Sequence, residues 1–414
     1  MTSPLANLGT PAAPSDSLAV GQRSLGDPDV RYPLWPPLTE GCPVTSTESV
    51  AYPVEVDYAY DKVPADFFAT ASARPRGHER WAPLLPPLHG PGLAEGGTPL
   101  LPLGDGVWIK DESRNPTWSH KDRLNRVAVG AAAGVGAEGV VVASSGNHGA
   151  SAAAYAARAG LRCAVLTSDE VPAAVDAFLR GYGAAVLRVP TEARWPLLRR
   201  IVERTGYHPV SNLTPAAHTG HGFGPEGYKT LAYEIFTDLG VVPRAVFVPT
   251  GYGEMLFGIW KGFAELVRLG HAERVPRLYG CEPAAGGPLA AAVRGGVPAA
   301  HVPLGPTAAY AIACPVGGYR GVVALRESAG AALLVTDEEM AAARSELARN
   351  GVWAELSAAA GLAGLRQLGA PDDGPVVCVS TSSGFKDQDL LAAGPSPVVD
   401  PEDWDAVERR LRQV

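Results

Sequence analysis

The chain is organised around the stretch DESRNPTWSHKDR, residues 111–123. A short strand-like run at 107–109 precedes it, and an Ala/Val/Gly-rich helical segment starts near Leu124. Asn-Pro-Thr at 115–117 predicts a turn, so Lys121 stands between a turn and a helix start, where a domain can hold it rigidly. By itself, the charged tripeptide at this lysine is an ordinary solvated cluster. The later parts of the chain favour a different interpretation.

Three more polar or glycine-rich turns follow predicted strands. The second turn, SSGNHGAS at 144–151, stands between a predicted strand at 139–143 and a helix that we expect to begin near Ala150. The third, VPTGYGE at 248–254, also connects a strand to a helix, and the fourth, VSTSSGFKD at 379–387, follows a strand. Because parallel strands present their carboxyl ends at one edge of an open α/β sheet, we expect the four turns to meet there and bind a ligand.

The segments between the turns alternate between strand and helix patterns. Apolar runs predict strands at 140–142, 163–166 and 185–187. Helical periodicity predicts helices at 150–159, 171–182, 194–205, 225–238, 256–269, 338–349 and 357–368. This alternation predicts an α/β fold with parallel sheets and right-handed crossovers. The GxGxxG match at 134–139 follows a helix and precedes a strand, the reverse of a dinucleotide site, so we expect its glycines to end the helix.

The composition excludes several classes of protein. A chain of 414 residues with 46% hydrophobic and 19% charged residues suits two soluble globular domains. A net charge of −8 without a Lys/Arg block argues against nucleic acid as a partner, and no apolar run reaches the roughly 18 residues of a membrane span. The five cysteines are scattered and the N-terminus lacks a secretory signal pattern, so we expect reduced thiols in a cytoplasmic protein.

Taken in order, the four turns resemble the fold-type II pyridoxal-phosphate (PLP) enzymes, and most closely the threonine synthases among them. The resemblance spans about residues 57–387 and includes GGTPL at 96–100 and IWKGF at 259–263. It implies an α/β architecture of two open, twisted, mainly parallel-sheet domains with the cofactor in the cleft between them. It also implies a small-molecule amino-acid substrate and a homodimer.

The same resemblance suggests how the chain divides. Residues 1–37 would form a Pro/Ala-rich N-terminal arm, extended or partly disordered. Residues 38–139 and 210–414 would form the large PLP-binding domain, and 140–209 a smaller, mobile domain. Relatives can bind zinc through several cysteines in the entry segment, but here Cys42 stands alone, and one thiol cannot build a tetrahedral site. We therefore expect no metal.

The resemblance also gives each turn a role. Lys121 would be the catalytic Schiff-base lysine, which requires a pKa lowered by burial or by a nearby cation. Asn147 would hydrogen-bond the phenolic oxygen of the cofactor, and Thr381 would place an uncharged hydroxyl at the pyridine nitrogen, where it supports a weaker electron sink than an aspartate would. The implied substrate-binding residues are Ser119, Ser144, Ser145, Gly146 and His148.

Two anion sites are expected in a threonine-synthase-like enzyme. The cofactor phosphate would be cradled by Thr250, Gly251, Tyr252, Gly253, Glu254 and Met255 at a helix start. A phosphate would repel the carboxylate of Glu254, so we expect this side chain to point away along the first helical turn. The phosphate that leaves the substrate needs a second site, to which Arg114, Ser119, Arg123 and Lys229 could contribute.

Two histidines depart from the threonine-synthase pattern. His120 stands directly before the lysine, where the family often has Phe, and we interpret it as a passive neighbour of the cofactor rather than an added acid or base. His148 follows Asn147 where threonine synthases usually carry Thr, as in dehydratase-like relatives, so the identity of the substrate stays open. Three further residues, which we interpret as structural, are Glu282, Glu355 and Cys378.

We therefore expect a PLP-dependent lyase or synthase that acts by elimination and replacement at Cβ or Cγ, as in the conversion of O-phosphohomoserine to threonine. The nearest alternative keeps the cofactor and acts on O-phosphoserine, serine or threonine, by β-replacement as in a cysteate synthase or as a dehydratase. A third possibility is a non-catalytic paralogue that binds PLP or an amino acid. The joint presence of Lys121, Asn147 and Thr381 argues against it.

Overall fold

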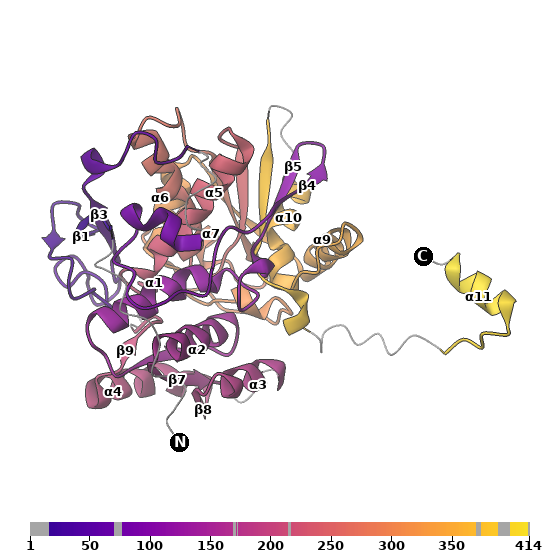
Figure 1. Ribbon diagram of the computed structural model, residues 1–414, viewed down its shortest axis with the longest axis horizontal. Helices are drawn as coiled ribbons and strands as arrows, with labels where there is room; N and C mark the ends of the chain where they lie inside the picture. Colours follow the sequence, from indigo (N-terminus) through magenta and orange to yellow (C-terminus); the bar gives the residue numbers. More distant parts are fainter. Residues whose placement is uncertain are drawn as a thin grey trace, which may run out of the picture.

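A six-stranded sheet forms the largest layer of the protein, whose computed structural model is shown in Figure 1. The structure describes residues 16–69, 77–168, 171, 173–213, 217–369, 374–387 and 398–412. Neighbouring strands of the sheet run parallel, except that the edge strand β4 is antiparallel to β5. In spatial order the strands are β12 (Ala331–Val335), β11 (Arg277–Pro283), β10 (Ala245–Pro249), β13 (Val376–Ser380), β5 (Val107–Asp111) and β4 (Leu100–Gly104).

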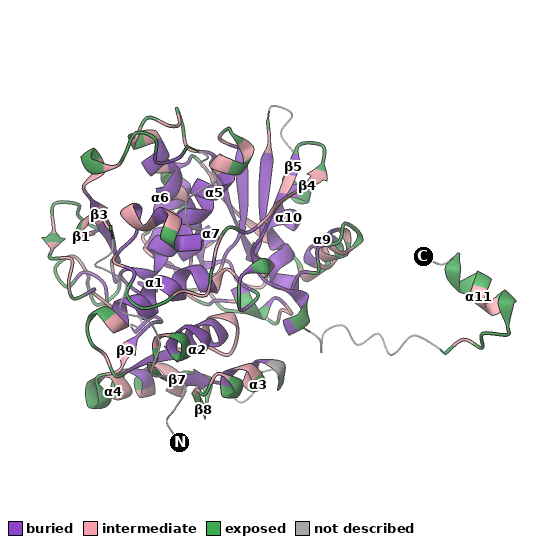
Figure 2. Ribbon diagram, in the orientation of Figure 1, coloured by how far each residue is buried: buried purple, intermediate pink, exposed green. Residues whose placement is uncertain are grey.

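The central strands β10 and β13 are apolar runs in which every residue is buried (Figure 2). Helices on both faces of a parallel sheet produce this burial. Successive side chains of β10 point to opposite faces, so Val246 packs with α5 and α6, whereas Phe247 packs with α9 and α10. These four helices are α5 (Thr230–Leu239), α6 (Glu254–Arg268), α9 (Asp337–Arg349) and α10 (Ala360–Leu368).

A second sheet has four parallel strands and carries the second polar turn. In spatial order its strands are β8 (Ala185–Arg188), β7 (Arg162–Thr167), β6 (Gly139–Ala143) and β9 (His208–Pro209). The helices of this unit are α2 (Asn147–Ala159), α3 (Ala173–Gly181) and α4 (Arg194–Thr205). Helix α1 (Lys121–Gly134) packs against α2 and shares a hydrophobic cluster with the large sheet, so it joins the two sheets.

The two mainly parallel sheets confirm the predicted α/β fold. The chain from β6 to β9 builds the four-stranded sheet, in the region where the sequence predicted a smaller domain. Its mobility relative to the rest stays a prediction.

The N-terminal region differs from the predicted arm where the structure describes it. Strand β1 (Ala19–Ser24) is the middle strand of a three-stranded antiparallel sheet with β2 (Arg31–Tyr32) and β3 (Val54–Tyr58). Gln22 is buried, and its amide donates hydrogen bonds to three backbone carbonyls between residues 33 and 36. Local composition could not indicate this strand because it is held by pairing with β3, which comes later in the chain. Residues 1–15 lie outside the described residues.

The predicted helices of the two parallel sheets are present, and several of them start earlier than expected. Helix α2 begins at Asn147 and α6 at Glu254, so polar residues of the second and third turns lie within a first helical turn. The segment predicted as a helix at 225–238 begins as a 3-10 helix, η5 (Gly224–Lys229). The remaining α-helices are α7 (Pro288–Gly295), α8 (Tyr319–Glu327) and α11 (Trp404–Leu411). None of the helices within the described ranges has the length and apolar character that a membrane span requires.

Candidate active site

One cavity of about 270 Å³ is lined by residues from all four turns. These residues follow β6 in the four-stranded sheet and β10 and β13 in the six-stranded sheet, or start α1. The sequence-predicted residues that line the cavity are Lys121, Ser144, Ser145, Gly146, Asn147, His148, Thr250, Gly251, Tyr252, Gly253, Glu254, Met255 and Thr381. This is the position at which open parallel sheets bind ligands.

Backbone contacts join the first turn to the fourth. The His120 amide donates to the Thr381 carbonyl over 2.9 Å, and the Ser383 amide donates to the Trp118 carbonyl over 3.1 Å. Between them, Ser119 and Ser382 form an isolated antiparallel bridge. Trp118 has a positive φ of 63°, a conformation that is costly for a bulky residue and here lets the chain turn into α1. Lys121, the first residue of α1, is therefore held close to Thr381.

Lys121 is half-buried, and its amine has few partners among the described residues. Its Nζ atom lies 3.3 Å from the hydroxyl of Tyr228 and 5.8 Å from the centre of the same ring. Burial lowers the pKa of Lys121, although the Glu254 carboxylate opposes this shift. A lowered pKa increases the neutral fraction of the amine, which is the form that reacts with an aldehyde.

His120 packs beside this lysine and contacts Thr381 and Tyr228 rather than an acidic side chain of the described residues. Its Nδ1 atom lies 3.2 Å from the Thr381 carbonyl oxygen, and its ring stacks on Tyr228 with 5.6 Å between centroids. Burial, followed by the charge of Lys121, holds the pKa of His120 well below its usual range. A neutral ring in this setting agrees with the interpretation of His120 as a passive neighbour.

Asn147, the first residue of α2, is fixed at both ends of its amide. Its Nδ2 atom donates to Glu355 Oε2 over 2.9 Å and to Ser382 Oγ over 3.4 Å. Its Oδ1 atom accepts a 2.6 Å hydrogen bond from the Lys386 amine, whose pKa burial lowers to about 8. These contacts tie the four-stranded sheet to the segments that surround the end of β13.

The rest of the second turn places polar groups and one buried imidazole at the cavity. Ser145 Oγ accepts the Ser168 amide over 2.8 Å, and Ser144 Oγ accepts the Gly146 amide over 3.3 Å. The His148 Nε2 atom is buried and has no hydrogen-bond partner among the described residues. Burial and the nearby Lys121 lower the pKa of His148 to about 3, so this ring is neutral near pH 7.

The third turn requires glycine for two steric reasons. Gly253 has φ +81°, and a Cβ atom there would lie 2.8 Å from the Gly321 backbone. A Cβ at Gly251 would lie 3.1 Å from Cys314 Sγ. The turn leads directly into α6, whose first backbone N–H groups have no partner within the helix and no side-chain cap. Free amides at a helix start form an anion site.

Glu254 does not point away from the cavity as the sequence predicted. Its buried carboxylate lines the cavity, and Oε2 lies 3.3 Å from His218 Nε2. Its Oε1 atom has no hydrogen-bond partner among the described residues. Burial opposes ionisation of Glu254, but His218 and then Lys121 outweigh it, so the pKa lies well below its usual range. Local sequence gave no sign of His218 as a partner because it comes from a different segment.

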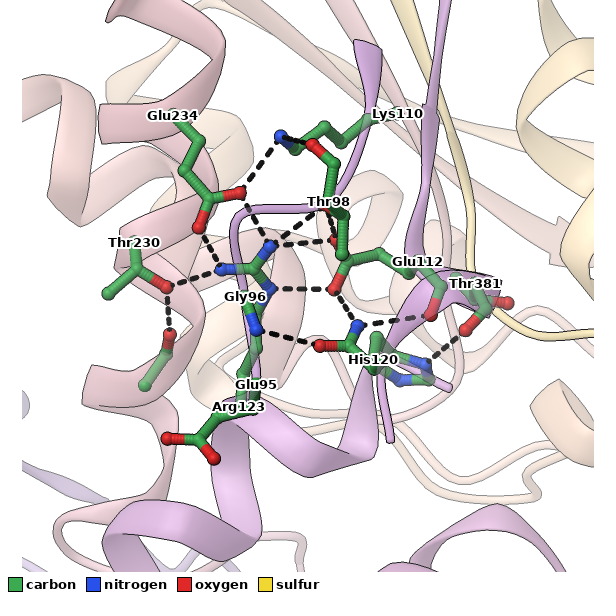
Figure 3. A network of polar contacts seen from close by, with 12 residues as sticks. Glu95, Gly96, Thr98, Lys110, Glu112, His120, Arg123, Thr230, Glu234 and Thr381 are labelled. Carbon is green, nitrogen blue, oxygen red and sulfur yellow. Dashed lines mark hydrogen bonds and ion pairs between the residues drawn. The ribbon is translucent and has the colours of Figure 1, made fainter. Parts of the chain in front are cut away.

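The residues expected to form a second anion site are not at the cavity. Arg123 is fully buried in the network of Figure 3, where it donates to Glu112 over 2.6 and 2.8 Å and to Glu234 over 2.7 Å through each of two nitrogens. Lys229 is paired with Glu226 and Glu265, and Arg114 with Asp111. Ser119, whose Oγ is buried without a hydrogen-bond partner in the described structure, does not line the cavity either.

Several lining residues come from segments that the sequence did not single out. Four of these lining residues with charged, polar or aromatic side chains are Arg194, Trp195, His218 and Tyr310. Tyr228, which contacts Lys121, also lies between motifs. Glu355, interpreted as structural, lines the cavity and has a pKa raised by burial and by Asp387. No group of three or more metal-ligating side chains suited to a metal occurs among the described residues.

The chain matches the family model of pyridoxal-phosphate dependent enzymes over residues 92–382. It therefore belongs to this family, and its fold and cavity are those of the fold-type II class. Among its relatives are threonine synthases. That of Methanocaldococcus jannaschii is 33% identical over 344 residues, which cover 78% of this chain and 83% of the relative. That of Mycobacterium tuberculosis is 36% identical over 326 residues, covering 74% and 88%.

Solved structures of the same fold have lower sequence identity. Maize serine racemase has a TM-score of 0.60 at 18% identity and covers 76% of this chain and 93% of its own. O-ureido-L-serine synthase has a TM-score of 0.59 at 22% identity, covering 75% and 97%. These similarities establish the fold.

The residues present fit PLP. The cavity offers one half-buried lysine, Lys121, free amides at the start of α6 for a phosphate, and an uncharged hydroxyl at Thr381. The glycines at 251 and 253 allow the backbone to approach a bound group closely. The ionised carboxylate of Glu254 is the one feature of this turn that disfavours an anion.

Proposed function

We propose that the protein is a threonine-synthase-like lyase that converts O-phosphohomoserine to threonine by elimination and replacement at the side chain. The observation that carries this proposal is the convergence of four separate turns on one cavity, with a half-buried lysine of lowered pKa and a threonine, Thr381, among its lining residues. The similarity to threonine synthases over about three quarters of the chain supports it.

In this proposal the cofactor would be held by Lys121 at its aldehyde, Asn147 at its phenolic oxygen, Thr381 at its ring nitrogen, and the turn 250–255 at its phosphate. When bound, PLP supplies an electron sink for charge that develops at the substrate Cα. An uncharged Thr381 hydroxyl keeps this sink weaker than a carboxylate partner would, which favours loss of a leaving group.

Lys121 would remove and return the proton at Cα. A general base works best when its pKa lies near the working pH, and burial shifts this amine in that direction. The substrate carboxylate would bind at the turn 144–148, where the start of α2 contributes the positive end of its dipole. Contacts of Asn147 with Glu355 and Lys386 would fix its amide for the cofactor.

A second candidate keeps the cofactor and changes the substrate to O-phosphoserine, serine or threonine. It is favoured by His148, whose unpaired Nε2 lies where the threonine synthases carry a smaller residue. Phosphate release and amino-acid products should be measured with O-phosphohomoserine, O-phosphoserine and serine. We expect threonine and phosphate from O-phosphohomoserine. Turnover restricted to the serine compounds would replace the proposal by this candidate, and cofactor binding without any turnover would indicate a non-catalytic paralogue.

The proposal extends to a homodimer in the cytoplasm. All five cysteines are free and buried, which suits a reducing compartment. Light scattering coupled to size exclusion would measure the mass in solution, and we expect twice that of the 43.0 kDa chain.

A further inference from the structure

A phosphate at the end of the substrate side chain needs a cation at the cavity, and Lys121 is assigned to the cofactor. Arg123 and Lys229 have buried carboxylate partners and do not line the cavity. The lining histidines His120, His148 and His221 are neutral because burial lowers their pKa, and His218, which also lines the cavity, is paired with the Glu254 carboxylate. A different residue must therefore supply the positive charge.

Arg194 is the one guanidinium among the described residues that line the cavity. It is the first residue of α4 and half-buried, and its Nε atom donates to the Thr191 carbonyl over 3.3 Å. Its guanidinium lies 5.5 Å from the centre of the Trp195 ring. Within the described ranges it forms no ion pair with a carboxylate, so its charge is available to a ligand.

The third turn carries a negative charge, in contrast to the positive charge of Arg194. Glu254 is ionised there, and one of its oxygens has no hydrogen-bond partner in the described residues. Tyr252 of the same turn and Arg194 both line the cavity. A second anion in the cavity would be repelled by Glu254 and attracted to Arg194.

We propose that Arg194 is the specificity-determining residue that binds the phosphate on the substrate side chain. This inference rests on the proposed function and names the residue that selects its substrate. A guanidinium presents paired N–H donors that match a phosphate, and the cation–π contact with Trp195 favours the observed position of the group. Helix α4 lies in the segment from β6 to β9 that builds the four-stranded sheet. Binding would therefore also link this segment to the phosphate-bearing end of the substrate.

The test compares R194Q and R194K with the control R200Q. Arg200 is exposed on the same helix and does not line the cavity, so its substitution removes the same charge from the same element. Binding of the phosphonate in which a carbon replaces the ester oxygen of O-phosphohomoserine is measured by calorimetry on the holoenzyme. Loss of a charge-assisted hydrogen bond should weaken binding about 10- to 100-fold in R194Q. R194K should lie between R194Q and the wild type, and R200Q should match the wild type.

Turnover gives the second measurement. In R194Q the KM for O-phosphohomoserine should rise more than kcat falls, with serine binding unchanged. Equal affinity of R194Q and wild type for the phosphonate, alongside normal wild-type turnover, would overturn the inference and leave the proposed function intact. A wild-type enzyme that reacts with serine but neither binds the phosphonate nor uses O-phosphohomoserine would overturn both. Equal losses in R194Q and R200Q would show a general charge effect and would also overturn the assignment.

Discussion

Two cations two residues apart at the start of α1 are surrounded in opposite ways. Arg123 is saturated: its three nitrogens donate to Glu112, Glu234, Thr98 and Thr230, and Lys110 joins through Glu234 (Figure 3). Among the described residues, the Lys121 amine has one hydrogen bond, of 3.3 Å, to the Tyr228 hydroxyl. Buried polar groups are normally satisfied, so the comparison separates an anchor of the fold from a site that awaits a ligand.

The largest effect is expected for Lys121, the cation with few partners. Lys121→Ala should reduce turnover at least about a thousandfold, because the variant lacks both the attachment point and the base. The free energy of unfolding without cofactor should stay constant or rise, because a half-buried amine with one weak partner among the described residues is removed. Steady-state kinetics and urea titration measure the two quantities. Lys62→Ala, at an exposed lysine, serves as control and should leave turnover unchanged.

Substitution of Arg123, the fully hydrogen-bonded cation, should lower the free energy of unfolding. Arg123→Met would leave Glu112 and Glu234 buried without their main partner, and we expect a loss of about 3–5 kcal/mol in the free energy of unfolding. Urea titration followed by circular dichroism would measure it. A loss below about 1 kcal/mol would contradict the view that this network anchors the fold.

The free energy of unfolding should depend on pH through His148, whose ring is neutral in the folded protein. The folded ring stays neutral down to a pKa of about 3, whereas the unfolded ring takes up a proton below its usual 6.5. Stability is therefore lost as pH falls below 6.5. Between pH 7 and pH 5 this ring should account for about 1–2 kcal/mol. Urea titrations at both values should show a smaller loss in His148→Gln, and equal losses would argue against a buried neutral ring.

The smallest effect is expected at an exposed ion pair. Arg366 is 46% exposed and pairs with Glu346. Arg366→Gln should change the free energy of unfolding by no more than about 1 kcal/mol, because water screens the pair. Thermal melting compared with Arg123→Met would place both on one scale. A similar loss in the two variants would remove the distinction between buried and surface cations.

The sequence predicted the fold well where each segment carries its own pattern. The apolar runs of β6, β7, β10 and β13 and the helices between them could be identified because periodicity and burial act locally. The edge strands β4 and β12 and the mixed-polarity strand β11 were not predicted, and neither was β1. Their pairing partners lie elsewhere in the chain, and tertiary contact decides their structure.

The candidate site could be predicted for turns that follow strands, because topology alone brings those ends together. The same reasoning could not predict Arg194, which lines the cavity from the start of α4, or Tyr228, which contacts Lys121 from the 3-10 helix η5. It also gave the wrong direction for Glu254, because the partner His218 is contributed by the folded structure. The roles assigned to the site residues stay predictions.

We infer that the cofactor is attached to Lys121 and to none of the buried lysines of the chain. The holoenzyme can be reduced with borohydride to fix the cofactor on its lysine, digested, and mapped by mass spectrometry. We expect cofactor mass on the peptide that contains Lys121 and none on peptides with Lys110, Lys229, Lys261 or Lys386. A label on one of those four with Lys121 unmodified would contradict it.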